Sequence, residues 1–118
     1  MKKSLHILAD FYGCRGEKKF LTTQKFTEPK LVSVARRAGF KVIGTLFHEF
    51  PNGGITGLVL VSESHIALHT WPEKDYLTVD VFFCNFTRDN SLKVRNAILE
   101  LRKLFQPRKV VARKIVRD

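Results

Sequence analysis

Six short stretches of the chain combine apolar runs or apolar–polar alternation with β-branched and aromatic residues, a pattern typical of β-strands. They cover residues 5–13, 40–50, 55–62, 65–71, 76–84 and 109–116. The turn sequence PNGG joins the second stretch to the third, and PEKD at 72–75 joins the fourth to the fifth. The pattern therefore predicts six strands, with the central ones arranged as hairpins.

Two further stretches repeat their apolar residues at helical spacing. The first contains Leu31, Val34, Ala35 and Ala38. Thr27 is predicted to cap this helix and Gly39 to end it. The second contains Val94, Ala97, Ile98, Leu101, Leu104 and Phe105. It is predicted to begin at Asn90 or Ser91 and to stop before Pro107.

The predicted order of elements is β-α-β-β-β-β-α-β. Residues 14–26 are polar and follow neither period, so we expect a loop there. Clustered hairpins with only two helices favour an antiparallel sheet that carries both helices on one face. The predicted fold is α+β, a two-layer sandwich, and it forms a single domain over residues 1–118.

The PEKD connection also predicts how its two strands pair. Trp71 would face Tyr76 across the connection. The same register pairs His69 with Thr78, Ala67 with Asp80, His65 with Phe82 and Glu63 with Cys84. The opposite face then collects Ile66, Leu68, Val79, Val81 and Phe83, an apolar set that a one-residue slip would expose.

This register separates the polar residues into two clusters. Cys84 arrives beside the peptide between Glu63 and Ser64, whereas His69 lies roughly 20 Å away along the strand. If the preceding strand folds back on this hairpin, Thr56 comes close to His69. One chain cannot bring both clusters to one reaction centre. A twofold partner could do so, by placing each cluster against the other cluster of its mate.

Length and charge narrow the class of protein. The 118 residues are 44% hydrophobic, enough for one core. Lys and Arg number 21 against 11 acids, a formal charge of +10, and seven of the basic residues lie in the last 18 positions. Because these alternate with core-type residues, we favour a solvated helix face and a charge-protected edge strand over a nucleic-acid partner. The chain lacks about 18 consecutive apolar residues and a signal-peptide cleavage site, so we expect a cytoplasmic protein without membrane attachment.

The pattern of cysteines and histidines argues against a metal site. Cys14 and Cys84 form neither a CxxC pair nor a disulfide framework, and we interpret Cys14 as a small buried apolar residue. His65 and His69 would lie roughly 13 Å apart on a strand, too far to share an ion. His6 lacks ligand-spaced partners in the sequence. We therefore expect no metal.

Several motifs resemble one family. SESHIALHTWPE at 62–73, VDVFFC at 79–84, HILADFYGC at 6–14 and HEFPNGGITG at 48–57 are similar to the small prokaryotic-type S-adenosylmethionine decarboxylases. These are pyruvoyl-dependent enzymes of polyamine synthesis. The resemblance implies self-processing, in which the Ser64 hydroxyl attacks the Glu63 carbonyl and elimination from the resulting ester leaves a pyruvoyl group. The products would be residues 1–63, the beta chain, and 64–118, the alpha chain.

The same resemblance implies roles for the other polar residues. The pyruvoyl group derived from Ser64 would be the covalent cofactor, forming a Schiff base with the substrate amine and accepting the electrons left by decarboxylation. Cys84 would protonate the substrate α-carbon, His69 would act as base in processing, and Thr56 would hold the processing intermediate. The family builds each site from two protomers of a homodimer, which agrees with the separation of the two clusters.

Substrate contacts also follow from the resemblance. Phe50 would stack on adenine with Tyr12 on its other side, and Glu73 would bind the ribose hydroxyls. Trp71 is a further candidate substrate-binding residue, although a tryptophan at this position most often packs in the core or at its rim. Asp75 stands where the family carries part of an aromatic–glycine pair. Related enzymes decarboxylate arginine or ornithine, and Asp75 could pair with a guanidinium or ammonium group.

Three functions remain open from the sequence. We favour decarboxylation of S-adenosylmethionine. The alternative within the same chemistry is decarboxylation of arginine or ornithine. The alternative from another class is a basic nucleic-acid-binding domain, which only the charge of +10 supports.

Overall fold

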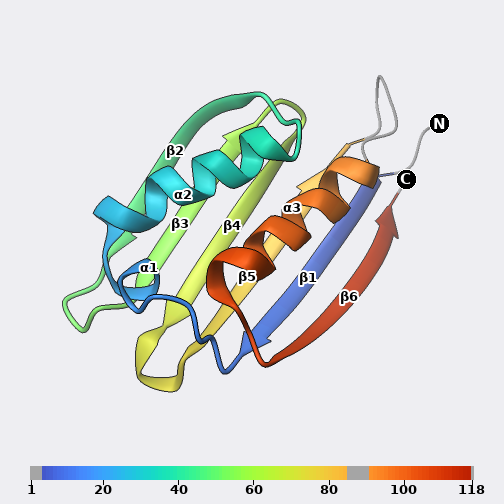
Figure 1. Cartoon of the computed structure of the whole chain (residues 1–118). Coiled ribbons are helices and arrows are strands. Elements are labelled where there is room, and N and C mark those ends of the chain that lie inside the picture. Colours follow the sequence, from blue (N-terminus) through green and yellow to red (C-terminus); the bar gives the residue numbers. More distant parts are fainter. Residues whose placement is uncertain (1–3, 85–90, 118) are drawn as a thin grey trace.

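A computed structural model of the chain describes residues 4–84 and 91–117. One six-stranded sheet has the order β2-β3-β4-β5-β1-β6, and every neighbouring pair is antiparallel (Figure 1). The strands are β1 (Ser4–Tyr12), β2 (Val42–Glu49), β3 (Ile55–Val61), β4 (Ser64–Trp71), β5 (Tyr76–Phe83) and β6 (Lys109–Arg117). The helices are α1 (Lys19–Thr22), α2 (Gln24–Arg37) and α3 (Ser91–Phe105), and Pro72–Lys74 form the short 3-10 turn η1. The predicted order of strands and long helices is confirmed.

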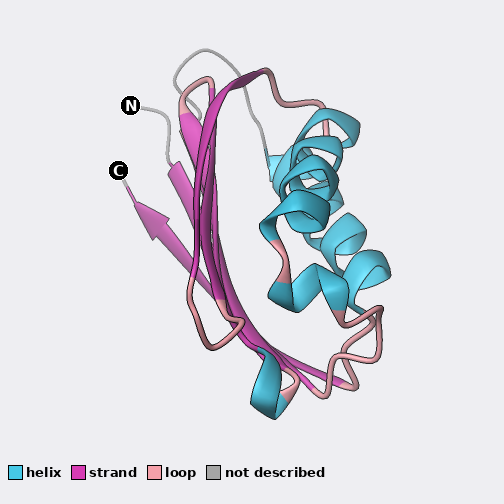
Figure 2. Ribbon diagram, turned by 90° about the vertical axis from the view of Figure 1, so that its left-hand side faces the viewer, coloured by secondary structure: helices cyan, strands magenta, loops and turns pink. Residues whose placement is uncertain are grey.

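The helices all lie on one face of the sheet (Figure 2). The opposite face, here called the outer face, is covered by no helix of the described residues. The predicted two-layer α+β architecture is therefore confirmed. The basic C-terminal stretch forms β6, an edge strand, as its charge pattern predicts.

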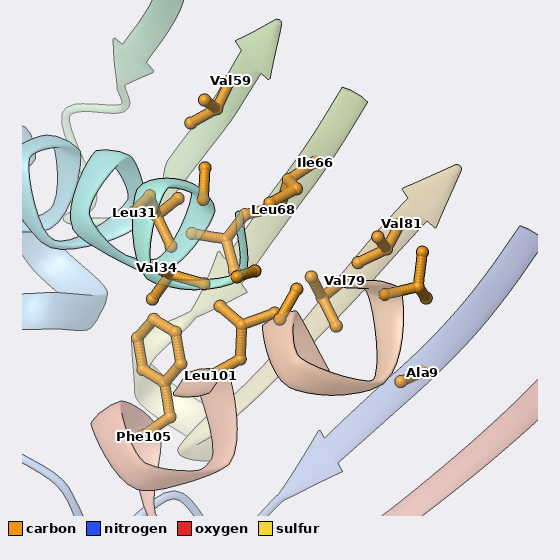
Figure 3. Close-up of a cluster of buried hydrophobic side chains, with 14 of the residues drawn as sticks. Ala9, Leu31, Val34, Val59, Ile66, Leu68, Val79, Val81, Leu101 and Phe105 are labelled. Carbon is orange, nitrogen blue, oxygen red and sulfur yellow. The ribbon is translucent and has the colours of Figure 1, made fainter. Parts of the chain in front are cut away.

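The core fills the space between the sheet and the helices. Side chains on the helix-facing side of β3, β4 and β5 meet Leu31 and Val34 of α2 and Leu101 and Phe105 of α3 (Figure 3). The predicted core residues of the central hairpin, Ile66, Leu68, Val79, Val81 and Phe83, are all buried. Burial of each such side chain stabilises the fold by about 1.5–3 kcal/mol. This face therefore fixes the register of the strands.

The predicted register of the central hairpin is confirmed. Trp71 pairs with Tyr76, His69 with Thr78, and His65 with Phe82. The connection between the strands is η1 followed by Asp75, whose φ of 48° is left-handed. Because side chains alternate across a strand, this register places His65, His69 and Trp71 on the outer face.

The start of the first helix differs from the prediction. Thr27 does not cap it: the helix begins at Gln24, and Thr27 is fully buried, its hydroxyl 2.7 Å from the carbonyl of Phe20, to which it donates. Residues 19–22 form α1, so the predicted loop over residues 14–26 is wrong there and at the start of α2. The apolar pair Phe20 and Leu21, both buried, anchors α1 in the core, where the hydroxyl of Thr70 on β4 donates to the carbonyl of Leu21 at 2.7 Å. Gly39, with φ of 100°, follows the helix end as predicted.

The second long helix carries the predicted apolar stripe. It runs over Ser91–Phe105 and buries Val94, Ala97, Leu101 and Phe105. The alternative start at Asn90 lies outside the described residues. None of the described helices has the length and the apolar character needed to cross a membrane.

Candidate active site

The turn between β3 and β4 carries the peptide that joins Glu63 to Ser64. Val61 pairs with Ser64, so only Ser62 and Glu63 lie in the turn. Glu63 has a φ of 66°, a left-handed conformation that glycine adopts more readily. A non-glycine residue held there stores about 1–3 kcal/mol of backbone strain. The strained residue therefore directly precedes Ser64.

Ser64 points to the helix face of the sheet. Its side chain is 8% exposed, and among residues 4–84 and 91–117 its hydroxyl oxygen has no hydrogen-bond partner. A buried hydroxyl without a partner costs about 1–3 kcal/mol, so such groups are few in folded proteins and a catalytic role is one reason for keeping them. Strain and an unpaired hydroxyl thus coincide on two neighbouring residues.

Cys84 lies beside this turn, as the register predicts. Its backbone N–H donates to the carbonyl oxygen of Glu63 at 3.1 Å. An N–H aimed at a carbonyl oxygen stabilises negative charge that develops there. The carbonyl next to the Ser64 hydroxyl is therefore polarised by the backbone of Cys84.

The second predicted cluster lies at the opposite end of β3 and β4. Thr56 pairs with His69, and the Thr56 hydroxyl lies 3.0 Å from His69 Nδ1. Both side chains are on the outer face. His69 is five positions from Ser64 along β4, about 17 Å at strand spacing. The predicted separation of the two clusters within one chain is confirmed.

A pocket of about 260 Å³ opens beside Thr56 and His69. Phe50, Trp71 and Glu73 also contribute to its wall. The remaining lining residues are Asn52, Gly54, Ile55 and Thr70. The fold thus gathers three of the predicted substrate-binding residues around the two predicted processing residues.

A row of aromatic rings continues from this pocket across the outer face. The rings of Trp71 and Tyr76 are tilted against each other with centroids 5.4 Å apart, and those of Tyr76 and Tyr12 likewise at 5.0 Å. Tyr12 is therefore adjacent to the row rather than part of the pocket wall. Burial and the nearby Asp10 raise the pKa of Tyr76, which keeps its hydroxyl protonated. Tyr76 was not predicted as a site residue, although its position opposite Trp71 in the register is the signal that identifies it.

Asp75 does not line the pocket. Its carboxylate accepts a hydrogen bond from Lys18 Nζ at 2.5 Å, and the same ammonium group donates to the carbonyl of Pro72. Cys14, beneath it, is buried as predicted. Burial, helped by the charge of Asp75, raises the pKa of the Cys14 thiol to about 11. Both residues therefore have structural partners away from Thr56 and His69.

The outer face also contains a cluster that the sequence did not predict. His6, His65 and Asp80 come from three adjacent strands and bring their ligand-type atoms within 4.8 Å of one another. The expectation that His6 lacks such partners is wrong. Its partners lie 59 or more positions away and become neighbours only through the pairing of β1 with β5 and of β5 with β4.

Comparison with known proteins decides the family. The sequence profile described as S-adenosylmethionine decarboxylase matches residues 5–118. The chain belongs to the S-adenosylmethionine decarboxylase family. Among its relatives, the S-adenosylmethionine decarboxylase proenzyme of Clostridium kluyveri is 49% identical over 79 residues, 67% of this chain. That alignment spans 61% of the relative's length.

Two further members of the family support the assignment over more of the chain. The S-adenosylmethionine decarboxylase proenzyme of Syntrophomonas wolfei is 42% identical over 96 residues, 81% of this chain and 74% of the relative. The crystal structure of the adenosylmethionine decarboxylase from Aquifex aeolicus superposes with a TM-score of 0.85 at 28% identity. The superposition covers 97% of this chain and 89% of the Aquifex aeolicus chain. The family and fold suggested by the sequence motifs are confirmed.

Proposed function

We propose that this protein is a self-processing, pyruvoyl-dependent decarboxylase of S-adenosylmethionine in polyamine synthesis. The observation that carries the proposal is the turn at residues 61–64, where a buried hydroxyl with no partner in the described parts of the chain follows a strained residue. Membership of a decarboxylase family whose relatives are named proenzymes supports it. The same relatives favour adenosylmethionine over arginine or ornithine as substrate. We further propose that the protein acts in the cytoplasm.

Processing would use the chain's own atoms. The Ser64 hydroxyl adds to the Glu63 carbonyl carbon, and the peptide C–N bond breaks to leave an ester. Loss of the Ser64 α-proton then expels Glu63 as a carboxylate and leaves a dehydroalanine. A proton shift from its nitrogen to the β-carbon gives an imine, which water hydrolyses to the ketone with release of ammonia. The products are residues 1–63 and a chain beginning at 64 with a pyruvoyl group. The Cys84 N–H, 3.1 Å from the Glu63 oxygen, would stabilise the first addition.

The residues around the turn suit this group. A ketone carbonyl at position 64 has an acceptor oxygen but no donor, so it would remove the unsatisfied donor that the Ser64 hydroxyl presents. When formed, the pyruvoyl carbonyl supplies an electron sink for loss of a carboxylate. Cys84 would hold a proton for the substrate α-carbon, since a thiol can donate near neutral pH.

A homodimer would complete each site. His69 and Thr56 lie too far along the sheet to act on Ser64 of the same chain. The outer face exposes 75% of Leu46, 46% of Leu60 and 44% of Ile115, apolar area that a second copy could cover. A twofold partner packed on this face would bring its Thr56 and His69 to the Glu63–Ser64 turn. The partner's His69 would then serve as the processing base.

The pocket supports a nucleoside-like substrate. Phe50 and Trp71 are each only partly buried and offer ring faces to adenine or to a sulfonium cation. The Glu73 carboxylate can accept hydrogen bonds from ribose hydroxyls. At about 260 Å³ the pocket is smaller than the roughly 300–1,000 Å³ typical of ligand sites, which favours additional walls from a partner.

Two measurements test the proposal together. Intact-mass analysis of denatured protein is expected to find fragments 1–63 and 64–118, the second blocked by a group that borohydride reduces. Release of carbon dioxide is then compared for adenosylmethionine, arginine and ornithine. Turnover of adenosylmethionine alone supports the proposal. A folded, uncut chain without reducible carbonyl contradicts the mechanism, and turnover of arginine or ornithine instead contradicts the substrate.

A further inference from the structure

We propose that His6, His65 and Asp80 form a binding site for a divalent transition-metal ion of the zinc type. The cluster lies on the outer face, the face that the proposed homodimer would cover, and away from the pocket at Thr56 and His69. His6 belongs to β1, Asp80 to β5 and His65 to β4, three strands that are neighbours in the sheet. The site is independent of the proposed processing reaction.

The donor atoms already converge. Asp80 Oδ1 lies 3.6 Å from His65 Nε2 and is also in contact with His6 Nε2. All three ligand atoms lie within 4.8 Å of one another. In a tetrahedral zinc site with bonds of about 2.0–2.2 Å, neighbouring ligand atoms are about 3.4 Å apart. Rotations that move the atoms by about 1 Å would therefore suffice for binding.

The rings are held in place before any ion binds. Phe82 pairs with both His6 and His65 across β5. Its ring centroid lies 5.5 Å from that of His6 and 5.8 Å from that of His65. Side chains that start from a rigid sheet and pack on a common ring lose little conformational freedom on binding.

The donor set selects the ion. Two imidazole nitrogens and one carboxylate oxygen suit zinc, cobalt or nickel, with the fourth position left to water. Magnesium and calcium prefer sites built of oxygen ligands and are expected to bind poorly. The Arg117 guanidinium lies 5.6 Å from the Phe82 ring and opposes a cation, whereas the Asp80 carboxylate offsets that charge. Each side chain is only partly exposed, which limits competition from solvent.

The site would have a structural consequence if the chain is cut before residue 64, a point that rests on the proposed function. His6 would then belong to the first fragment, and His65 and Asp80 to the second. A single ion would bridge the two fragments one residue from the new end. Testing the uncut Ser64→Ala chain beside the wild type separates the two ideas, because the ligands are present in both.

The test is a titration of metal-free protein with cobalt(II) chloride, followed by competition with zinc(II) chloride. We expect one cobalt ion per chain with the intense visible absorption of tetrahedral cobalt, displaced by zinc but not by magnesium. His6→Gln, His65→Gln and Asp80→Asn should each weaken binding more than about tenfold, the least that even outer-shell changes cost. The matched control is His48→Gln, which removes an outer-face imidazole from β2 outside the cluster.

A second measurement detects the ligand nitrogens directly. In nitrogen-15 spectra of the wild type, zinc should shift the Nε2 signals of two histidines, assigned to His6 and His65 by their absence in the corresponding variants or by through-bond correlation. Absence of cobalt or zinc binding to both folded wild type and folded Ser64→Ala, equal affinity in the cluster variants, or loss of binding in His48→Gln would each overturn the proposal. Binding in Ser64→Ala but not in the wild type would overturn the bridging role.

Discussion

The two ends of the β3–β4 hairpin differ in how their polar groups are held. At the Thr56 end the hydroxyl and imidazole contact each other, and a pocket opens beside them. At the Glu63 end the backbone is left-handed, and the Ser64 hydroxyl is buried without a partner among the described residues. The first arrangement suits the proposed binding of substrate, and the second suits the proposed covalent change.

This difference shows how one short hairpin can separate two tasks. Polar groups near a ligand need stable partners so that their positions are fixed before binding. A group that is to attack a neighbouring peptide gains from having no competing partner. The sheet keeps the two environments about 17 Å apart along β4, so neither disturbs the other.

The strongest way to break the comparison is Ser64→Ala. Without the hydroxyl no ester can form, so we expect a single full-length mass and complete loss of decarboxylation. The matched control is Ser62→Ala in the same turn, an exposed residue that should leave cutting intact. Cutting in Ser64→Ala, measured by intact mass, would show that the Glu63 end is not the reactive one.

Cys84→Ala separates turnover from processing at the same end. Because the backbone N–H to Glu63 remains, cutting should proceed, whereas loss of the proton donor should lower kcat by about 10²- to 10⁴-fold. Cys14→Ala removes the other thiol and is expected to keep kcat in the folded protein. Equal kcat for both variants would remove Cys84 from the proposed role.

Mixed chains test whether the two ends meet across a dimer. A His69→Ala chain and a Cys84→Ala chain are each expected to be nearly inactive. With random pairing, half of the dimers contain one chain of each kind, and each of these has one intact site of its two. Co-expression should therefore restore roughly a quarter of wild-type activity. No recovery in purified heterodimers, identified by two affinity tags, would contradict shared sites.

A comparison of Glu73 with Asp75 tests the role of the pocket in substrate binding. Glu73→Gln removes a charged acceptor from the pocket wall and should raise KM for adenosylmethionine about 10- to 100-fold, the effect of losing a charge-assisted hydrogen bond. Asp75→Asn breaks only the exposed contact to Lys18 and should change KM little. A larger change in KM for Asp75→Asn than for Glu73→Gln would support the predicted role of Asp75 in binding a basic substrate.

The smallest expected effect concerns pH and the buried Cys14. In the folded protein the pKa of the Cys14 thiol is about 11, compared with an ordinary value of 9.0. Between these values the unfolded chain binds fewer protons, so stability falls as pH rises. The free energy of unfolding is measured with urea at pH 8 and at pH 10.5 in an uncut Ser64→Ala background. Between these two pH values, Cys14→Ala should lose roughly 1–2 kcal/mol less of this free energy than its parent. An equal loss would contradict the raised pKa.

The sequence predicts the strands of the sheet better than the segment that contains α1 and the start of α2. The register of the central hairpin follows from alternation and from the four-residue connection, because a slip would expose Ile66 and Val81. The α1 segment is not recognised because it contains only two apolar residues, Phe20 and Leu21, too few to show a helical period. Thr27 resembles a cap, yet its hydroxyl satisfies the Phe20 carbonyl inside the core.

The candidate site divides along the same line. Residues close together on one hairpin, such as Thr56 with His69 and Glu63 with Cys84, are predicted by counting along strands. Contacts between distant segments are not, since pairing of β1 with β5 cannot be read from either strand alone. This is why Tyr12 beside Tyr76, and His6 beside Asp80, emerge only from the folded sheet.

The position of β1 has a consequence for a nicked molecule. This strand, from the segment before residue 64, is hydrogen-bonded on one side to β5 and on the other to β6, both from the segment after it. The two pieces are interleaved. β3 of the first piece is also paired with β4 of the second. Neither piece could diffuse away without opening three complete ladders, so we expect isotope-labelled fragments to exchange between molecules no faster than the whole protein unfolds.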